Sequence, residues 1–204
     1  MKELIRTNDP KKITWLAEVL AERGIDAVVQ NTDTSNVEER LGKFSHRIMV
    51  DEEDFEVANG LFILAEQDIT SDETFDALLD GRVLLRQPKE GYRVAIDPVL
   101  LAASIGANPK DRVLDVGSGV GAAALCLASR CADVEVYGLE LQPELVARSR
   151  LNATASGLSI KFFQGDLLNP PSIITDGGFD HVMANPPYLP TERADPRISW
   201  AKAK

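Results

Sequence analysis

The stretch RVLDVGSGVGAAALCLAS, residues 112–129, decides the fold of this 204-residue chain. It predicts an apolar strand over 112–116 that carries Asp115 near its end, and a helix over 122–129. Between them lies a turn with Gly117, Gly119 and Gly121. A strand, a glycine turn and a helix bring backbone N–H groups and a helix N-terminus close to a ligand. The glycine pattern alone is weak, because dinucleotide-binding domains begin similarly.

Three more strand patterns follow, and each one ends in a polar residue. The strand 134–139 ends in Glu140, whose carboxylate suits hydrogen bonding to a ribose diol. Alternatively, this carboxylate faces solvent and caps the helix 143–155, which ends at Gly157. The strand 159–164 leads to Asp166. The strand 179–184 must break at the sequence Asn185-Pro186-Pro187-Tyr188, because two prolines cannot continue a ladder. Alternating strands and helices predict an α/β fold whose ligands bind at the carboxyl ends of the strands.

Four segments together resemble a class I methyltransferase that uses S-adenosylmethionine: VLDVGSGVG, GLELQPELVARSRLNA, QGDLL and FDHVMANPPY. The motif NPPY resembles that of the methyltransferase branch whose members methylate planar nitrogens. The lead-in LLRQPKEGYRVAIDPVLLAAS, residues 84–104, is similar to that of bacterial tRNA (adenine-N6) methyltransferases. The resemblance covers about residues 80–195 and implies a Rossmann-like sheet.

The resemblance also assigns roles. Asp115 and the three loop glycines would hold the methionine end of the cofactor, Glu140 its ribose and Asp166 its adenine. Asp97 would order the same loop or, equally, cap the helix that starts at Pro98. The expected catalytic residues are Asn185, Pro186, Pro187 and Tyr188. No metal is expected, since two cysteines are too few for a four-thiolate zinc site.

The chemistry follows from the target nitrogen, whose lone pair is delocalised and poorly nucleophilic. The side-chain oxygen of Asn185 and the carbonyl of Pro186 would accept its two N–H bonds. Tyr188 would stack on the base, which must leave its neighbours to be reached. Positioning and electrostatics would supply most of the rate.

Taken over the whole chain, the net charge of −10 argues against a nucleic-acid partner. The argument changes when the charges of the two parts of the chain are counted separately. Residues 1–80 hold 8 lysines and arginines against 19 aspartates and glutamates, a charge of −11, whereas residues 81–204 hold 14 against 13. The acidity therefore belongs to the first unit, which could bind a protein partner.

This first unit, residues 1–67, is predicted to have the order βαββα. We expect strands over 2–7, 25–29 and 47–50, a helix that Asp9 caps and Gly24 stops, and an acidic helix from about Asp51. The segments KELIRTNDP and HRIMVDEED resemble a family of small bacterial signal-transducing domains that has no assigned chemistry.

Between the units, Thr70 and Glu73 form a capping-box pattern before Gly81, which predicts a connecting helix within 68–80. A hairpin of 82–87 with 92–96 and the methyltransferase domain, 81–204, would follow. Only 16 residues come after Tyr188, too few for the remaining strands of that family's sheet. We therefore expect a methyltransferase truncated after its fourth strand, with weak cofactor binding.

The sequence leaves three functions open and favours the first of them, because of the tRNA-methyltransferase-like lead-in before Asp97. The first is methylation of adenine N6 in tRNA, the second is methylation of a protein glutamine, and the third is a non-catalytic sensor or interaction protein. The start of the chain lacks the apolar segment of a secretory signal, and no apolar run is long enough to span a membrane. The cytoplasm is therefore the expected compartment.

Overall fold

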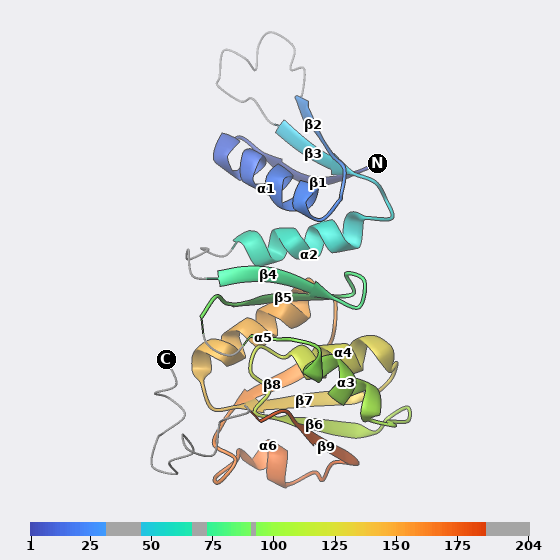
Figure 1. Cartoon of the computed structure of the whole chain (residues 1–204), viewed down its shortest axis with the longest axis vertical. Helices are drawn as coiled ribbons and strands as arrows, with labels where there is room; N and C mark the ends of the chain where they lie inside the picture. Colours follow the sequence, from blue (N-terminus) through green and yellow to red (C-terminus); the bar gives the residue numbers. More distant parts are fainter. Residues whose placement is uncertain (32–45, 67–72, 91–92, 187–204) are drawn as a thin grey trace. The chain divides into compact units, whose positions relative to one another are not determined.

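A computed structural model describes residues 1–31, 46–66, 73–90 and 93–186 (Figure 1). The chain forms two compact units, Met1–Asp68 and Ile69–Lys204. Within the described ranges, no helix is long and apolar enough to cross a membrane.

The first unit has the predicted βαββα order. Its elements are β1 (Lys2–Thr7), α1 (Pro10–Glu22), β2 (Ala27–Asn31), β3 (His46–Val50) and α2 (Phe55–Glu66). The antiparallel sheet has the order β1-β3-β2. Asp9 caps α1 by accepting from the Lys11 backbone N–H, and Gly24 ends the helix with a φ of +70°, both as predicted.

Two boundaries in this unit differ from the prediction. The strand expected at residue 25 begins at Ala27, because the Ile25 backbone N–H bonds to the Leu20 carbonyl and Ile25 packs as part of the helix ending. The helix expected at Asp51 begins at Phe55, because residues 51–54 form a turn in which the Asp54 N–H bonds to the Asp51 carbonyl.

The second unit is an α/β layer built on a parallel sheet of the order β8-β7-β6-β9. The strands are β6 (Arg112–Val116), β7 (Glu135–Glu140), β8 (Ile160–Gln164) and β9 (His181–Ala184), and β9 is an outer strand of the described sheet. The helices are α3 (Asp97–Ser104), α4 (Ala122–Arg130), α5 (Pro143–Ala155) and α6 (Ser172–Thr175). The sequence predicts the four strands and the helices α3, α4 and α5 closely, and α5 has the expected bounds, whereas it predicts no element at α6.

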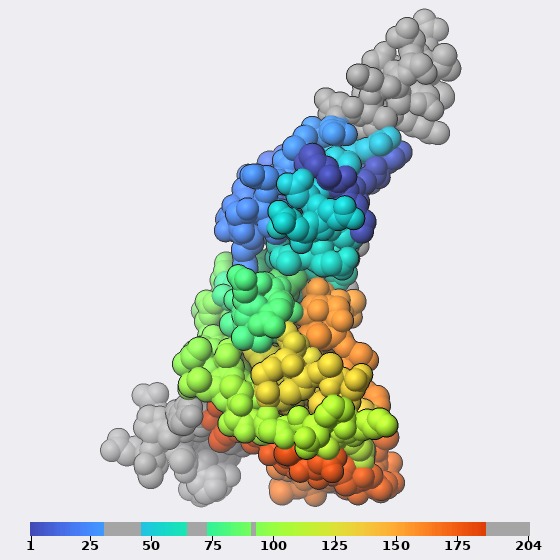
Figure 2. Space-filling model, turned by 90° about the vertical axis from the view of Figure 1, so that its right-hand side faces the viewer, coloured from blue at the N-terminus to red at the C-terminus, as the bar shows by residue number. Residues whose placement is uncertain are grey.

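Successive strand residues point to opposite faces, so the sheet has two cores. Val113, Val136 and Phe162 pack with residues of α3, α4 and α5 on one face. Leu114 and Tyr137 pack with Ile174 of α6 on the other face (Figure 1). The space-filling view shows the yellow surface of α4 beside the orange surface of α5 (Figure 2).

The connecting helix expected within 68–80 is wrong. The described part of that segment is a strand, β4 (Glu73–Leu78), which forms an antiparallel hairpin with β5 (Val83–Pro88). Gly81 stops no helix but belongs to the hairpin turn, where φ is positive at Leu79, Asp80 and Gly81. The hairpin predicted between 82–87 and 92–96 is also wrong, because β5 pairs back to β4 and residues 93–96 form no strand. Thr70 lies outside the described residues.

Candidate functional site

The candidate site lies along the edge where the four parallel strands end. Val116 at the end of β6 pairs with Leu139 of β7 and with Ala184 of β9, and Glu140 pairs with Gln164 of β8. The segments that follow these strands are therefore neighbours along one edge. In a parallel sheet this is the edge at which ligands bind.

The loop Gly117–Gly121 occupies the middle of this edge. The N–H groups of Gly117 and Ser118 donate to the Leu139 carbonyl at 2.8 and 3.1 Å, and the N–H of Gly119 donates to Glu140 Oε2 at 2.9 Å. All three glycines have positive φ, a conformation that other residues adopt only with strain.

The three loop glycines serve two different purposes. A methyl group added at Gly117 or Gly119 would meet no atom within 4 Å, so the space beside them is open to a ligand. A methyl group at Gly121 would lie 2.8 Å from the Phe162 ring and 3.1 Å from Ser149 Cβ. Gly121 is therefore required by packing as well as by its backbone conformation.

Glu140 is the carboxylate that organises the loop. Its side chain is 7% exposed, and its second oxygen accepts from the Gln142 N–H at 2.9 Å. Gln142 is the residue before α5, so this carboxylate orders the start of that helix and the glycine loop together. Each carboxylate oxygen keeps a further lone pair, which leaves Glu140 able to accept from the hydroxyl groups of a ribose.

Asp115 lies in β6, two residues before the same loop, and is buried with 2% of its surface exposed. Its Oδ2 accepts from the Ala124 N–H at 3.2 Å and so satisfies a free donor at the start of α4. Burial raises the pKa of Asp115 to about 7, the Ala124 hydrogen bond opposes that rise, and the charge of Glu140 adds to it.

The other expected site residues lie further along the edge or outside the described ranges. Asn185 is half-buried and Pro186 is exposed directly after β9, whereas Pro187 and Tyr188 lie outside the described residues. Asp166 is exposed after β8, and its Oδ1 accepts from the Leu168 N–H at 2.9 Å. Hydrogen bonds thus join Glu140 to the loop and Asp115 to the helix that follows it, while strand register places Asp166 and Asn185.

Asp97 is the first residue of α3, which packs against α4. The residue in the capping position is Ile96, whose side chain makes no capping hydrogen bond. The alternative that Asp97 caps the Pro98 helix is therefore wrong.

Sequence reasoning missed one residue that touches the loop. Asn152 of α5 is completely buried and donates from Nδ2 to the Val120 carbonyl at 3.0 Å. A signal was present, because Asn152 falls on the same helix face as Val146 and Ser149, which are also buried. A polar side chain on a buried face needs hydrogen-bond partners from elsewhere in the fold.

Comparison with known proteins finds two families. Residues 93–201 match the family described as "Methyltransferase small domain", and residues 1–66 match the one described as "Putative prokaryotic signal transducing protein". These matches agree with the two resemblances that the sequence motifs carry.

Individual relatives have two different activities. A release factor glutamine methyltransferase of Deinococcus radiodurans is 46% identical over 122 residues, which make up 58% of this chain and 41% of that protein. A tRNA1(Val) (adenine(37)-N6)-methyltransferase of Porphyromonas gingivalis is 38% identical over 105 residues, 48% of this chain and 41% of that protein. The chain thus spans about two fifths of the length of these curated relatives.

Among solved structures, a SAM-dependent methyltransferase from Agrobacterium tumefaciens is 18% identical, with a TM-score of 0.45. The alignment covers 59% of this chain and 42% of that one.

Proposed function

This chain belongs to the methyltransferase small domain family, and we propose that it transfers the methyl group of S-adenosylmethionine to a planar nitrogen. One observation carries the proposal: the glycine loop, the two buried carboxylates and Asn185 lie along the same edge of the parallel sheet. The cofactor would supply an activated methyl group on a sulfonium. The residues of the chain then have to bind it, orient it and present the acceptor nitrogen.

The residues present suit such a cofactor. The open space beside Gly117 and Gly119 admits a ligand close to the backbone. Asp115 lies just before the loop at the end of β6 and is proposed to serve the methionine end, and Glu140 has spare lone pairs for the ribose. Asp166 would face the adenine from the end of β8, and Asp97 would order the loop from α3.

Asn185 and Pro186 carry the proposed step at the acceptor nitrogen. An amide oxygen and a backbone carbonyl are both acceptors, so together they can hold the two N–H bonds of an exocyclic amino group. That geometry favours a more pyramidal and more nucleophilic nitrogen. Pro187 would fix the turn, and Tyr188 would stack on the planar group that bears the nitrogen.

For the substrate we propose N6 of an adenine in tRNA. The support is the lead-in 84–104 together with the relative named as a tRNA adenine-N6 methyltransferase. Residues 81–204 carry almost no net charge, and the acidity of the chain lies in the first unit. The net charge of −10 is therefore no argument against an RNA substrate at the site.

A protein glutamine is the second candidate substrate. The observation that favours it is the 46% identity to a release factor glutamine methyltransferase. A glutamine amide is also a planar nitrogen with two N–H bonds, so the same pair of acceptors at Asn185 and Pro186 would serve it.

The test has two stages. Calorimetry measures whether the chain binds S-adenosylmethionine, and labelled cofactor is then offered with undermodified tRNA or with a release factor. Asn185→Ala should bind cofactor but lose methyl transfer, whereas Asn108→Ala, an exposed amide before β6 at the opposite edge of the sheet, should keep both. Labelled tRNA supports the first substrate and labelled release factor the second. Binding without labelling overturns both substrates, and no binding overturns the function.

A further inference from the structure

We propose that Asn152 is a positioning residue for the cofactor site, which anchors the glycine loop to the β4–β5 hairpin. The side chain has no exposed surface and bonds to two separate segments. Its Oδ1 accepts from the Arg86 N–H at 2.8 Å, and its Nδ2 donates to the Arg86 carbonyl at 3.2 Å and to the Val120 carbonyl at 3.0 Å.

These three contacts fix the orientation of the amide. Nδ2 faces two carbonyl oxygens, and a carbonyl can only accept, so a flipped amide would place oxygen against oxygen twice. Both Nδ2 hydrogens are thereby used. The Val120 carbonyl consequently has a donor whose direction is set by strand β5.

The neighbouring Ser156 shows which of these contacts is specific to the loop. Ser156 Oγ accepts from the Leu84 N–H at 2.9 Å and lies 3.4 Å from the Leu84 carbonyl, so it joins α5 to the same strand. Asn152 repeats that contact two residues further along β5 and adds the bond to Val120. Ser156 is therefore a matched control that holds the hairpin to α5 without contacting the loop.

The hairpin is a stiff anchor because buried polar groups hold it. Glu73 of β4 accepts from Arg86 of β5 and from Arg148 of α5, and the Glu73 and Arg86 side chains are 6% and 7% exposed. This set of bonds ties both strands of the hairpin to the helix that carries Asn152.

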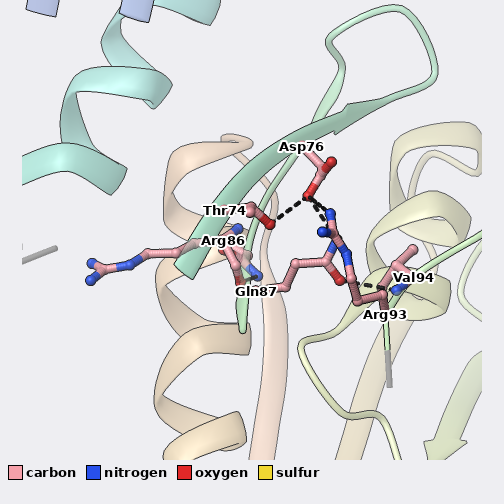
Figure 3. A network of polar contacts seen from close by, with 7 residues as sticks. Thr74, Asp76, Arg86, Gln87, Arg93 and Val94 are labelled. Carbon is pink, nitrogen blue, oxygen red and sulfur yellow. Dashed lines mark hydrogen bonds and ion pairs between the residues drawn. The ribbon is translucent and has the colours of Figure 1, made fainter. Parts of the chain in front are cut away.

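The same hairpin also holds the segment that leads into α3 (Figure 3). Gln87, 1% exposed, donates to Asp76 Oδ2 at 2.7 Å and accepts from the Val94 N–H at 2.9 Å. Arg93 reaches the same Asp76 oxygen at 3.3 Å. The hairpin thus bonds directly to the approach to Asp97 and is linked to the glycine loop through Asn152, and these are the two sides proposed for the cofactor.

Val120 is the point at which the anchor acts on the loop. It stands between Gly119 and Gly121, both of which have positive φ. Glycine costs the chain more conformational entropy on folding than other residues do, so a loop rich in glycine needs external bonds to keep one shape. Without the Asn152 donor, the loop would sample shapes that the cofactor must select against.

The inference rests on the proposed function for its cofactor, and the experiment separates the two. Cofactor affinity is measured by calorimetry on the whole chain, and hydrogen exchange is measured for the peptide 117–124. Asn152→Ala should weaken S-adenosylmethionine binding about tenfold and speed exchange in that peptide. Ser156→Ala should lose comparable stability against urea but keep both the affinity and the slow exchange of the loop.

If Asn152→Ala does not fold, Asn152→Ser replaces it, because a serine can bond to strand β5 as Ser156 does. Equal affinity and equal loop exchange in the wild type and the Asn152 variant would overturn the inference. A wild-type chain that binds no cofactor would overturn the proposed function, and the exchange of 117–124 would still decide whether Asn152 orders the loop.

Discussion

Replacing Asp115 by asparagine should change how stability depends on pH. The carboxyl group is 2% exposed, and burial raises its pKa to about 7, against about 3.9 in an unfolded chain. Between these values the folded state binds a proton that the unfolded state has lost. The free energy of unfolding therefore falls as the pH rises from about 4 to about 7, and the penalty is fully present above pH 7.

The size of the effect follows from the two pKa values. Their difference corresponds to about 4 kcal/mol when Asp115 is fully ionised. The substituted amide would not titrate but would keep an oxygen for the Ala124 N–H. The difference in unfolding free energy between Asp115→Asn and the wild type should therefore grow by about 4 kcal/mol in favour of the variant as the pH rises from 4 to 8. The new amide adds a difference that does not depend on pH.

The assay must follow the second unit alone. Urea titrations read by hydrogen exchange of a peptide from β6 and α4 meet that need, at several pH values from 4.5 to 8. Glu135→Gln is the control. Hydrogen bonds from Tyr137 and Lys161 lower the pKa of this exposed carboxyl, so the stability that its ionised form adds is lost only in acid. The difference in unfolding free energy between Glu135→Gln and the wild type should therefore stay constant above pH 5. If the wild type and Asp115→Asn show parallel pH profiles, the burial argument fails.

Three further changes test the packing of the second unit. Gly121→Ala should lower the free energy of unfolding by about 1–3 kcal/mol because its new methyl group meets an aromatic ring at a φ of +91°, whereas Gly106→Ala, which meets open space, should stay within about 0.5 kcal/mol in the same urea titration. Glu73→Gln should cost about 3–5 kcal/mol by leaving Arg86 buried without its carboxylate, and the double variant Glu73→Gln/Arg86→Met should recover most of that loss if the ion pair is the cause. Burial raises the pKa of Cys126 to about 11, so this thiol should react with a disulfide reagent at pH 7.5 about 100-fold more slowly than a free cysteine; a Cys126→Ser variant that retained the slow phase would contradict this.

The sequence predicts the parallel sheet well because its signals are local. Pro143 and Gly157 mark the two ends of α5, and Asn185-Pro186 marks the end of β9. Each of these residues acts on its own backbone, through a fixed φ, a positive φ or a missing N–H, so no distant partner is needed to place the boundary.

The hairpin could not be predicted in the same way. Phe75, Leu78 and Leu79 have a spacing typical of a helix, yet 73–78 is a strand because it pairs with β5 and because Glu73 bonds to Arg86 and Arg148. Those partners lie up to 75 residues away, outside any local window. Gly81 is expected to end a helix, but its positive φ serves the turn of the hairpin instead.

The residues of the candidate site also differ in whether local sequence patterns reveal them. Asp115, Glu140 and the glycine loop are found from strand ends, which local patterns show. Asn152 is missed because its position on the helix indicates only that it is buried, whereas its partners, residues 86 and 120, lie far away in the sequence.

The side chains of Asn152 and Ser156 cover the backbone of strand β5, and this has a consequence for the synthesis of the chain. Leu84 and Arg86 leave the ribosome well before the helix side chains that bond to their backbone, since Leu84 and Ser156 are 72 residues apart. At synthesis rates of about 5–20 residues per second, that interval lasts about 4–14 s. During it a buried strand, Val83–Leu85, offers a bare edge to any other nascent chain. The rate of translation between the hairpin and α5 should therefore govern how much of this protein aggregates during its synthesis.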